Sequence, residues 1–447
     1  MNYMPQSSKA QNTAELPYYA QDVDFDDLAK RNPDWAAVCE TARKSKWIDF
    51  QDPKVVLQLT NSLLKCDFSI AALDLPDDRL CPPVPVRWNY VRWIQELLDT
   101  TSDSYSDRYD PERQAIGLDV GVGASAIYPL LAASTRPEWR IAGTDIDQHS
   151  LDYARRNVDN NGLSKRVKLA LTTSDAPIIP LQALGVEELD FVMTNPPFYT
   201  SEADMQASYG SKQLPPSAIC TGSDNEMICS GGDVGFVLRI LEQSLQLREK
   251  VQWYTAMLGK LSSLQQIVAK LKEHDITNFA VACLQAGHKT KRWAVGWSFQ
   301  DFRPRVDVAR HGDLVHAVLP YPTAQTIAVP LMSTEWAGKK VDAAMKELDV
   351  RWQWRASSAV GVVEARENVW SRAARRKKRF GGNDSTMKEV KMGDAGEESS
   401  EEEEHVALAV KISVSNEKVD VRWLRGTDHV LFESFCGMLK RSLTARD

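Results

Sequence analysis

Residues 116–125, IGLDVGVGAS, carry an apolar strand pattern into a turn that contains Gly121 and Gly123. Glycines at such a turn let the backbone come close to a ligand at the carboxyl end of a parallel strand. The spacing is Asp-x-Gly-x-Gly and not the Gly-x-Gly-x-x-Gly of dinucleotide-binding enzymes, so it predicts no pyrophosphate site. By themselves, the two glycines fit a tight strand-to-helix turn equally well. Whether they mark a ligand site depends on how the neighbouring strands end.

Outward from this turn, the sequence alternates strand-like and helix-like segments. The strand patterns are 116–120, 139–145, 166–172, 189–194, 251–258, 277–285 and 291–299. Strands that alternate with amphipathic helices predict a parallel sheet with helices on both faces. The last strand, KRWAVGWSF, is expected to pair with 277–285 as an antiparallel edge. We therefore predict an α/β fold with a Rossmann-like, seven-stranded mixed sheet.

The flanking sequence predicts further parts. Residues 1–110 predict a helical N-terminal extension, residues 111–302 the sheet domain, and residues 303–447 a small α/β domain. An acidic segment rich in Gly and Ser interrupts the last domain at 381–405, and we expect it to be a disordered insert. The segment from Phe198 to Gly231 shows no helix or strand pattern, so we expect a long functional loop.

The composition is that of an ordinary globular protein, with 43% hydrophobic and 26% charged residues. The net charge of −7 arises in one place, because 381–405 holds nine acidic and two basic residues. The rest of the chain is balanced, so an anionic partner such as RNA is not excluded. No apolar run is long enough to span a membrane, and the N-terminus lacks a secretion signal pattern. Seven cysteines without a Cys-x-x-Cys pair indicate reduced thiols and no metal site.

The second strand pattern ends in Thr144-Asp145-Ile146-Asp147, about one βαβ unit after the glycines. A carboxylate at this position can accept hydrogen bonds from the ribose hydroxyls of a nucleoside cofactor. Capping of the following helix is the structural alternative. We expect Asp145 to bind ribose and Asp147 to cap the helix.

The fourth strand pattern ends in Asn195-Pro196-Pro197-Phe198. An aromatic amine such as adenine N6 is a weak nucleophile, because its lone pair is delocalised into the ring. The Asn195 side-chain oxygen and the Pro196 carbonyl can hold its two N–H bonds, and the prolines fix the backbone around them. Phe198, together with Tyr199, can stack on an unpaired base. The alternative is a proline-stiffened turn around a buried aromatic ring.

The chain resembles S-adenosylmethionine-dependent methyltransferases that modify an exocyclic or amide nitrogen, because the three motifs at its strand ends occur in the same order. Longer segments of the sequence restrict the resemblance to one family. These segments are, in order, VPVRWNYVRWIQEL, DVGVGASAIYPLL, NPPFYTSEADM, CTGSDNEMICSGGDVGFVLRILEQSLQL and TKRWAVGWSF. Over roughly residues 20–300 the chain resembles the methyltransferase-like protein 16 family, a relative of bacterial rRNA adenine-N6 methyltransferases. The resemblance implies a class I methyltransferase fold and N6 methylation of adenosine in structured RNA, above all U6 small nuclear RNA. S-adenosylmethionine is the implied methyl donor.

Individual residues receive roles on this basis. Predicted cofactor contacts are Arg87, Asp119, Gly121, Gly123, Ser125, Asp145 and Asn195. The predicted amine site is Asn195, Pro196, Pro197 and Phe198. Predicted RNA contacts are Phe198, Tyr199, Lys260 and Arg292.

Family members also carry a C-terminal domain, split by a disordered insert, that binds U6, and residues 303–447 are similar in layout. A basic run of Arg375, Arg376, Lys377, Lys378 and Arg379 ends an expected helix at 366–379. These side chains suit RNA phosphates, and the run equally fits a nuclear localisation signal, with a solvated helix end as the structural alternative. We expect a monomer in the nucleus, with the cytoplasm as a further location.

Two departures from the family leave questions open. The stretch AELPYYAQDVDFDD (14–27) is acidic where animal members have a basic arm, and Asp175 stands near a lysine position of those relatives. RNA binding by the arm and control of cofactor access by the Asp175 loop are therefore open. Alternative functions are methylation of ribosomal RNA or of a protein glutamine, and RNA binding by an inactive methyltransferase domain.

Overall fold

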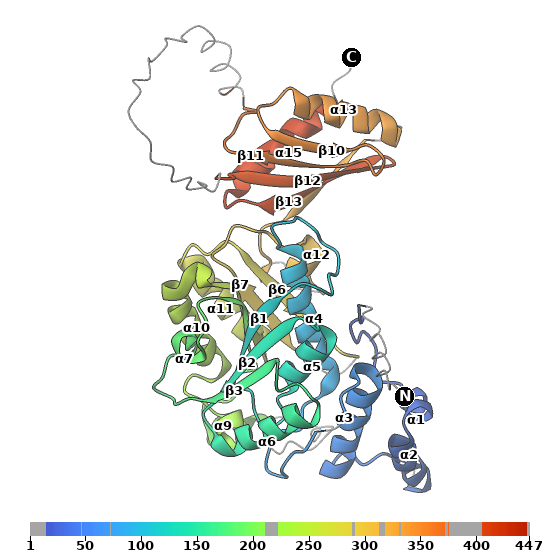
Figure 1. Ribbon diagram of the computed structural model, residues 1–447, viewed down its shortest axis with the longest axis vertical. Helices are drawn as coiled ribbons and strands as arrows, with labels where there is room; N and C mark the ends of the chain where they lie inside the picture. Colours follow the sequence, from blue (N-terminus) through green and yellow to red (C-terminus); the bar gives the residue numbers. More distant parts are fainter. Residues whose placement is uncertain are drawn as a thin grey trace, which may run out of the picture. The chain divides into compact units, whose positions relative to one another are not determined.

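The computed structural model describes residues 15–45, 47–71, 73–210, 222–287, 291–312, 318–329, 332–371, 374 and 405–444. These residues form two compact units (Figure 1). Unit 1 takes its described residues from 1–99, 108–300 and 310–319. Unit 2 takes its described residues from 100–107, 301–309 and 320–447. Unit 1 therefore includes both the N-terminal helices and the predicted Rossmann-like sheet.

Within the described residues, unit 1 is built on a mixed sheet of eight strands in the order β3-β2-β1-β4-β5-β7-β6-β8. The strands are β1 Ala115–Val120, β2 Trp139–Asp145, β3 Val167–Leu171, β4 Leu189–Thr194, β5 Val251–Leu258, β6 Phe279–Cys283, β7 Trp293–Trp297 and β8 Arg310–His311. Neighbours from β3 to β5 are parallel, and β7 runs antiparallel between β5 and β6. All seven predicted strands are confirmed. The expected antiparallel pairing of β7 with β6 is confirmed, but the expected edge position of β7 is wrong, because β7 lies between β5 and β6. The edge strand is the unpredicted two-residue β8, which pairs with β6.

Helices cover both faces of this sheet (Figure 1). α10 Gly232–Leu247 and α11 Leu261–Glu273 share one hydrophobic cluster with Tyr254 of β5. Neighbouring strand residues point to opposite faces, and the hydroxyl of the next residue, Thr255, lies 2.7 Å from that of Tyr90 in α4 Val84–Thr100. α4 therefore lies on the face opposite α10 and α11. The other helices of unit 1 outside 198–231 are α1 Phe25–Arg31, α2 Pro33–Ser45, α3 Pro53–Phe68, α5 Ile127–Thr135, α6 Gln148–Asn160 and α7 Leu181–Leu184, with a 3-10 turn at Arg248–Lys250.

The segment 198–231, predicted to lack elements of its own, contains α8 Glu202–Gly210 and α9 Asp224–Met227, with 211–221 outside the described residues. The prediction missed α8 because its sequence, EADMQASYG, has almost no amphipathic pattern. Tyr199 N donates to Met227 O at 2.9 Å, and Cys229 N donates to Tyr199 O at 3.0 Å. These bonds bring the two ends of the segment together directly after the Asn-Pro-Pro-Phe motif.

Unit 2 contains, among its described residues, a five-stranded antiparallel sheet in the order β10-β11-β12-β13-β9. Its elements are α12 Val306–Ala309, β9 Ala324–Ala328, α13 Thr334–Lys346, β10 Arg351–Arg355, β11 Val360–Ala365, β12 Leu408–Ser415, β13 Lys418–Arg425 and α15 His429–Thr444. β11 pairs with β12, so the sequence on both sides of the predicted insert joins one sheet. α13 and α15 pack on this sheet through one hydrophobic cluster.

The helix predicted at 366–379 is wrong over its first residues, since 366–371 form bends and irregular backbone. Trp370 explains the departure, because it is buried against Phe435 and its Nε1 donates to Ser434 Oγ at 3.2 Å. The rest of that segment, apart from Ala374, and the predicted insert, apart from His405, lie outside the described residues. No helix in the described part of the chain is long and apolar enough to cross a membrane.

Candidate active site

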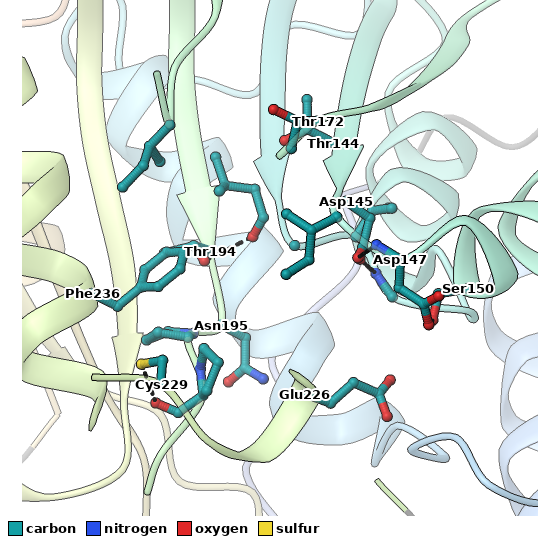
Figure 2. A pocket seen from close by; sticks show the side chains of 18 of the residues that line it. Thr144, Asp145, Asp147, Ser150, Thr172, Thr194, Asn195, Glu226, Cys229 and Phe236 are labelled. Atoms are coloured by element: carbon teal, nitrogen blue, oxygen red, sulfur yellow. Dashed lines mark hydrogen bonds between the residues drawn. The ribbon is translucent and has the colours of Figure 1, made fainter. Parts of the chain in front are cut away.

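The ends of β1, β2 and β4 meet at a cavity of about 280 Å³ (Figure 2). Gly121 N and Val122 N both donate to Thr144 O, at 2.9 and 3.0 Å, which fastens the end of β1 to β2. Thr194 Oγ1 donates to Val120 O at 2.8 Å, which fastens β4 to the other side of β1. The three predicted strand ends therefore lie at one edge of the sheet, where α/β folds bind ligands.

The glycine turn is open toward the cavity. Gly121 and Gly123 have φ values of 76° and 63°, in the left-handed region that favours glycine. A Cβ atom on Gly121 would meet nothing within 4 Å, so its backbone is free to approach a ligand. Ser125 lines the same cavity. The glycines therefore form a tight strand-to-helix turn, and the same turn also lines a cavity that a ligand could occupy.

Asp145 lies at the end of β2 and lines the cavity. Its Oδ2 accepts a hydrogen bond from Gly123 N at 2.8 Å, and its Oδ1 accepts one from Asp147 N at 3.0 Å. Each oxygen keeps a lone pair for a further donor, such as a ribose hydroxyl. Burial raises the pKa of Asp145, although the backbone hydrogen bonds act to lower it. Asp147 caps α6 by accepting from His149 N at 3.0 Å, which confirms the predicted cap.

Arg87 of α4 brings a buried positive charge to the cavity wall. Its Nη1 donates to the Tyr128 hydroxyl at 3.0 Å and lies 3.1 Å from Met257 Sδ, and both of these partners are neutral. A buried charge without a salt bridge is costly, so an anionic ligand group beside Arg87 would be strongly favoured. Arg87 therefore suits the α-carboxylate of an amino-acid-like cofactor.

Asp119 of β1 is fully buried and does not line the cavity. Neither carboxylate oxygen has a hydrogen-bond partner among the described residues. Burial and the charge of Asp145 raise the pKa of Asp119 well above its usual value, and Arg87 acts in the opposite direction. Of the predicted cofactor residues, Asp119 is thus the one that the structure places behind the cavity wall.

Asn195 stands at the end of β4, and Figure 2 shows its side chain at the cavity between those of Cys229 and Glu226. Its Oδ1 is buried and accepts no hydrogen bond from the described residues. A buried acceptor left unsatisfied costs about 1–3 kcal/mol. The geometry therefore leaves this oxygen available to a donor on the substrate. Pro196 and Pro197 line the same cavity.

Phe198 packs on the backbone of Gly259, directly after β5. A Cβ atom on Gly259 would lie 2.9 Å from Phe198 Cδ1, so only glycine leaves room for the ring. Asp233 holds this loop, with Oδ2 accepting from Gly259 N at 3.1 Å and Oδ1 accepting from Ser263 Oγ at 2.9 Å. Arg292 Cζ lies 5.5 Å from the centre of the Phe198 ring. Phe198 and Arg292 together form an aromatic and cationic surface.

The predicted RNA contacts Tyr199, Lys260 and Arg292 do not line the cavity. Tyr199 is half-buried, and Lys260 is exposed at the start of α11. Burial, followed by the charge of Arg87, lowers the pKa of Arg292. The predicted contacts Arg375, Arg376, Lys377, Lys378 and Arg379 lie outside the described residues. Within the described part of the chain, no group of three or more His, Cys, Asp or Glu residues could hold a metal ion.

Sequence reasoning missed several cavity residues because they come from segments far from the motifs. These residues are Leu80, Pro82, Thr172, Thr173, Ser174, Ala176, Pro177, Ile178, Glu226, Cys229, Phe236 and Arg239. The segment 78–82, called the strap here, runs between α3 and α4. Arg79 of the strap donates to Asp147 Oδ2 at 2.7 Å and to Ser150 Oγ at 3.0 Å. Two sequence signals pointed to these segments: the family resemblance of CTGSDNEMICSGGD and the departure at Asp175, whose loop was left open as a control of cofactor access.

The cavity combines a carboxylate suited to ribose, a buried cation suited to a carboxylate and an amide oxygen suited to an amine. Joined at the edge of a Rossmann-like sheet, they define a class I methyltransferase that acts on nitrogen. The model of the Methyltransf_10 family, described as RNA methyltransferase, matches residues 10–301. This match covers more than half of the chain, and the chain belongs to this RNA methyltransferase family, in its METTL16 branch.

Curated relatives support the same assignment. The U6 small nuclear RNA (adenine-(43)-N(6))-methyltransferase of Schizosaccharomyces pombe is 34% identical over 406 residues, covering 90% of this chain and 97% of its own. The RNA N(6)-adenosine-methyltransferase mettl16 of Danio rerio is 29% identical, covering 95% of this chain and 96% of its own. The hMettl16 catalytic domain in complex with MAT2A 3′UTR hairpin 1 has a TM-score of 0.53 and 32% identity, covering 62% of this chain and 92% of that chain.

The predicted family, fold and enzyme class are thereby confirmed: the protein is an RNA adenine-N6 methyltransferase that uses S-adenosylmethionine. The cavity fits this cofactor on its own evidence. Arg87 would hold the α-carboxylate, because it is buried at the cavity wall and forms no salt bridge among the described residues. Asp145 would hold the ribose through its remaining lone pairs, and Gly121 and Ser125 would lie along the ligand.

Proposed function

We propose that this protein methylates N6 of an adenosine in U6 small nuclear RNA, acting in the nucleus as a monomer. The observation that carries the chemistry is the buried, unpartnered Oδ1 of Asn195 at the cavity. This oxygen accepts no hydrogen bond among the described residues, and an amine N–H would supply one. Because Asn195 directly follows β4, the position of the amine is set by the end of this strand.

The residues of the amine site have separate tasks. Thr194 holds the end of β4 against β1, so that Asn195 is fixed in position. Asn195 Oδ1 and the Pro196 carbonyl then hold the two N–H bonds of the amine and direct its lone pair toward the methyl group. S-adenosylmethionine supplies that methyl group as part of a positively charged sulfonium, so the amine needs no prior activation by a metal. Phe198 offers a face on which the unstacked adenine can lie.

The extent of similarity favours U6 over ribosomal RNA as substrate. Ribosomal RNA large subunit methyltransferase F of Pseudomonas putida is 36% identical but covers 62% of this chain. The S. pombe enzyme, which is named for U6, covers 90% of it. Similarity over the C-terminal part is therefore associated with the U6 enzyme, and this argues against both the ribosomal and the protein-glutamine alternatives.

The nuclear location and the RNA role of the basic run are parts of the same proposal. Arg375, Arg376, Lys377, Lys378 and Arg379 suit phosphate contacts, a nuclear localisation signal, or both. With these five residues changed to Ala, fluorescence microscopy of the tagged chain measures the location and a U6 binding assay measures the affinity, and together they separate the two roles. Loss of nuclear signal with unchanged U6 affinity assigns the run to transport, and the reverse result assigns it to RNA.

Tritiated methyl transfer to a U6 hairpin tests the substrate and the amine site together. Wild-type protein is expected to label the RNA, and nucleoside analysis is expected to find N6-methyladenosine. Asn195→Ala is expected to lower the rate by at least 100-fold, whereas Asn160→Ala, an exposed asparagine at the end of α6, should leave it unchanged. Equal labelling by wild type and Asn195→Ala would remove the assignment of Asn195. Labelling of ribosomal RNA but not U6 would replace the proposed substrate.

A further inference from the structure

Glu226 lines the cavity, but neither the motifs nor the amine site use it. One of its carboxylate oxygens, Oε2, accepts hydrogen bonds from Leu80 N at 3.1 Å and from Ser223 N at 2.9 Å. The Ser223 hydroxyl lies 3.4 Å from the same oxygen. Oε2 therefore ties the strap to the segment that follows α8, although the two are far apart in sequence.

The second oxygen, Oε1, has no hydrogen bond among the described residues and faces the glycine turn. A Cβ atom on Gly123 would lie 3.6 Å from Glu226 Oε1. Apart from its chain neighbours, no other heavy atom of the described residues would lie within 4 Å of it. The N–H of the same glycine donates to Asp145 Oδ2 at 2.8 Å. Two carboxylates thus flank Gly123, one from the end of β2 and one from α9. Figure 2 shows both side chains at the cavity, together with Asn195.

A carboxylate in this position is suited to a donor or a cation on the ligand. It accepts hydrogen bonds through two oxygens and donates none. Burial raises the pKa of Glu226, although the hydrogen bonds from Ser223 and Leu80 and the charge of Arg79 act to lower it. A donor reaching Oε1 would offset part of the cost of this burial. S-adenosylmethionine carries such donors in its ribose hydroxyls and its α-ammonium group.

We propose that Glu226 is a cofactor-binding residue, whose Oε1 accepts a hydrogen bond from a ribose hydroxyl or the α-ammonium of S-adenosylmethionine while Oε2 holds the strap. The proposal deepens the methyltransferase assignment and rests on it, but not on the identity of the RNA. Cofactor binding and attachment of the strap to α9 are then coupled, because one side chain serves both. The strap is fastened at its other side by Arg79, which bonds to Asp147 and Ser150.

Calorimetric binding of S-adenosylhomocysteine to the full chain tests this role without any RNA. Glu226→Gln keeps the size of the side chain but removes its charge, and it is expected to weaken binding by at least tenfold. Glu202→Gln is the matched control, since Glu202 is exposed on α8 and does not line the cavity. It should bind as the wild type does. Failure to methylate U6 would leave this result untouched, so the two proposals fail separately.

A second ligand, 5′-methylthioadenosine, separates the two donors because it keeps the ribose and lacks the amino acid. Weaker binding of S-adenosylhomocysteine alone assigns Oε1 to the α-ammonium. Equal weakening for both ligands, with an unchanged melting temperature of the ligand-free protein, assigns it to a ribose hydroxyl. Equal weakening with a lowered melting temperature shows that Glu226 acts only by holding the strap, and it overturns the contact. Binding within twofold of wild type for both ligands overturns it as well.

Discussion

Thr194 Oγ1 donates a hydrogen bond to the Val120 carbonyl oxygen at 2.8 Å, and both residues are buried. The bond crosses from the last residue of β4 to the last residue of β1. It therefore joins the strand that carries Asn195 to the strand that carries the glycine turn. The link adds to the backbone pairing of the two strands, which ends at these same residues, and it helps to set the distance between the amine site and the cofactor site.

Replacing Thr194 with Val should weaken catalysis more than cofactor binding. Val has nearly the same shape but cannot donate, so the Val120 carbonyl is left without its partner at a cost of about 1–3 kcal/mol in the free energy of unfolding. Small displacements of Asn195 should lower kcat by about tenfold or more. Urea unfolding and methyl-transfer assays measure the two effects. Thr444→Val, at the end of α15, should change neither, and an unchanged kcat in Thr194→Val would show that the link is only structural.

Replacing Gly259 with Ala should displace the Phe198 ring. The new Cβ would lie 2.9 Å from Phe198 Cδ1, which is closer than packed atoms allow. We expect the KM for RNA to rise or kcat to fall by about tenfold, with the Kd of S-adenosylhomocysteine within twofold of wild type, because Phe198 does not line the cofactor cavity. Gly437→Ala, in α15, is the control substitution. A loss of cofactor affinity equal to the loss of activity would contradict a role of Gly259 through Phe198.

Local patterns predicted the sheet well, because its central strands are mostly apolar and alternate with amphipathic helices. They failed where tertiary contacts decide the structure. β8 is two residues long and carries no period of its own, and α8 has no apolar face. Trp370 lies in a segment with a helix-like composition, but its burial against Phe435 takes the backbone out of a helix.

The residues of the candidate site also fall into two groups, those that the sequence predicts and those that it does not. Gly121, Asp145 and Asn195 were predictable, because each ends or directly follows a strand and parallel strands end at one edge. Leu80 and Glu226 were not, because the strap and α9 reach the cavity only through folding of segments 146 residues apart. Asp119 was predicted as a contact from its place in the motif. Strand alternation alone cannot tell an end residue that faces the ligand from one that faces the core.

Replacing Arg87 with Met should weaken cofactor binding without destabilising the protein. The α-carboxylate would lose the buried cation of the cavity wall, and Arg239, which also lines the cavity, is exposed, so we expect the Kd of S-adenosylhomocysteine to rise about 100-fold. The Kd of 5′-methylthioadenosine, which has no carboxylate, should stay within about threefold. The free energy of unfolding without ligand should stay equal or increase, because a buried cation that forms no salt bridge among the described residues has been removed.

Calorimetry with both ligands and urea unfolding check these results. Arg140→Met, at an exposed position of β2, is the matched control and should bind both ligands normally. Equal weakening for the two ligands would place Arg87 at the nucleoside instead of the carboxylate. A lower free energy of unfolding would show that its bond to the Tyr128 hydroxyl stabilises the ligand-free protein.

Acid should weaken unit 2 through Asp107, which bonds to Lys411 Nζ at 3.1 Å and to Arg422 Nη1 at 2.8 Å. Burial acts to raise the pKa of Asp107, but these two cations lower it below its usual value of 3.8. Because the folded-state pKa is the lower one, its contribution is complete above about pH 5 and is lost as the pH falls through 3.8 and below. Asp107→Asn should therefore lower the free energy of unfolding by about 2 kcal/mol at pH 7 and by much less at pH 3. Asp349→Asn, at an exposed position, should leave the pH dependence unchanged, and an equal loss at both pH values in Asp107→Asn would show that packing rather than charge is responsible.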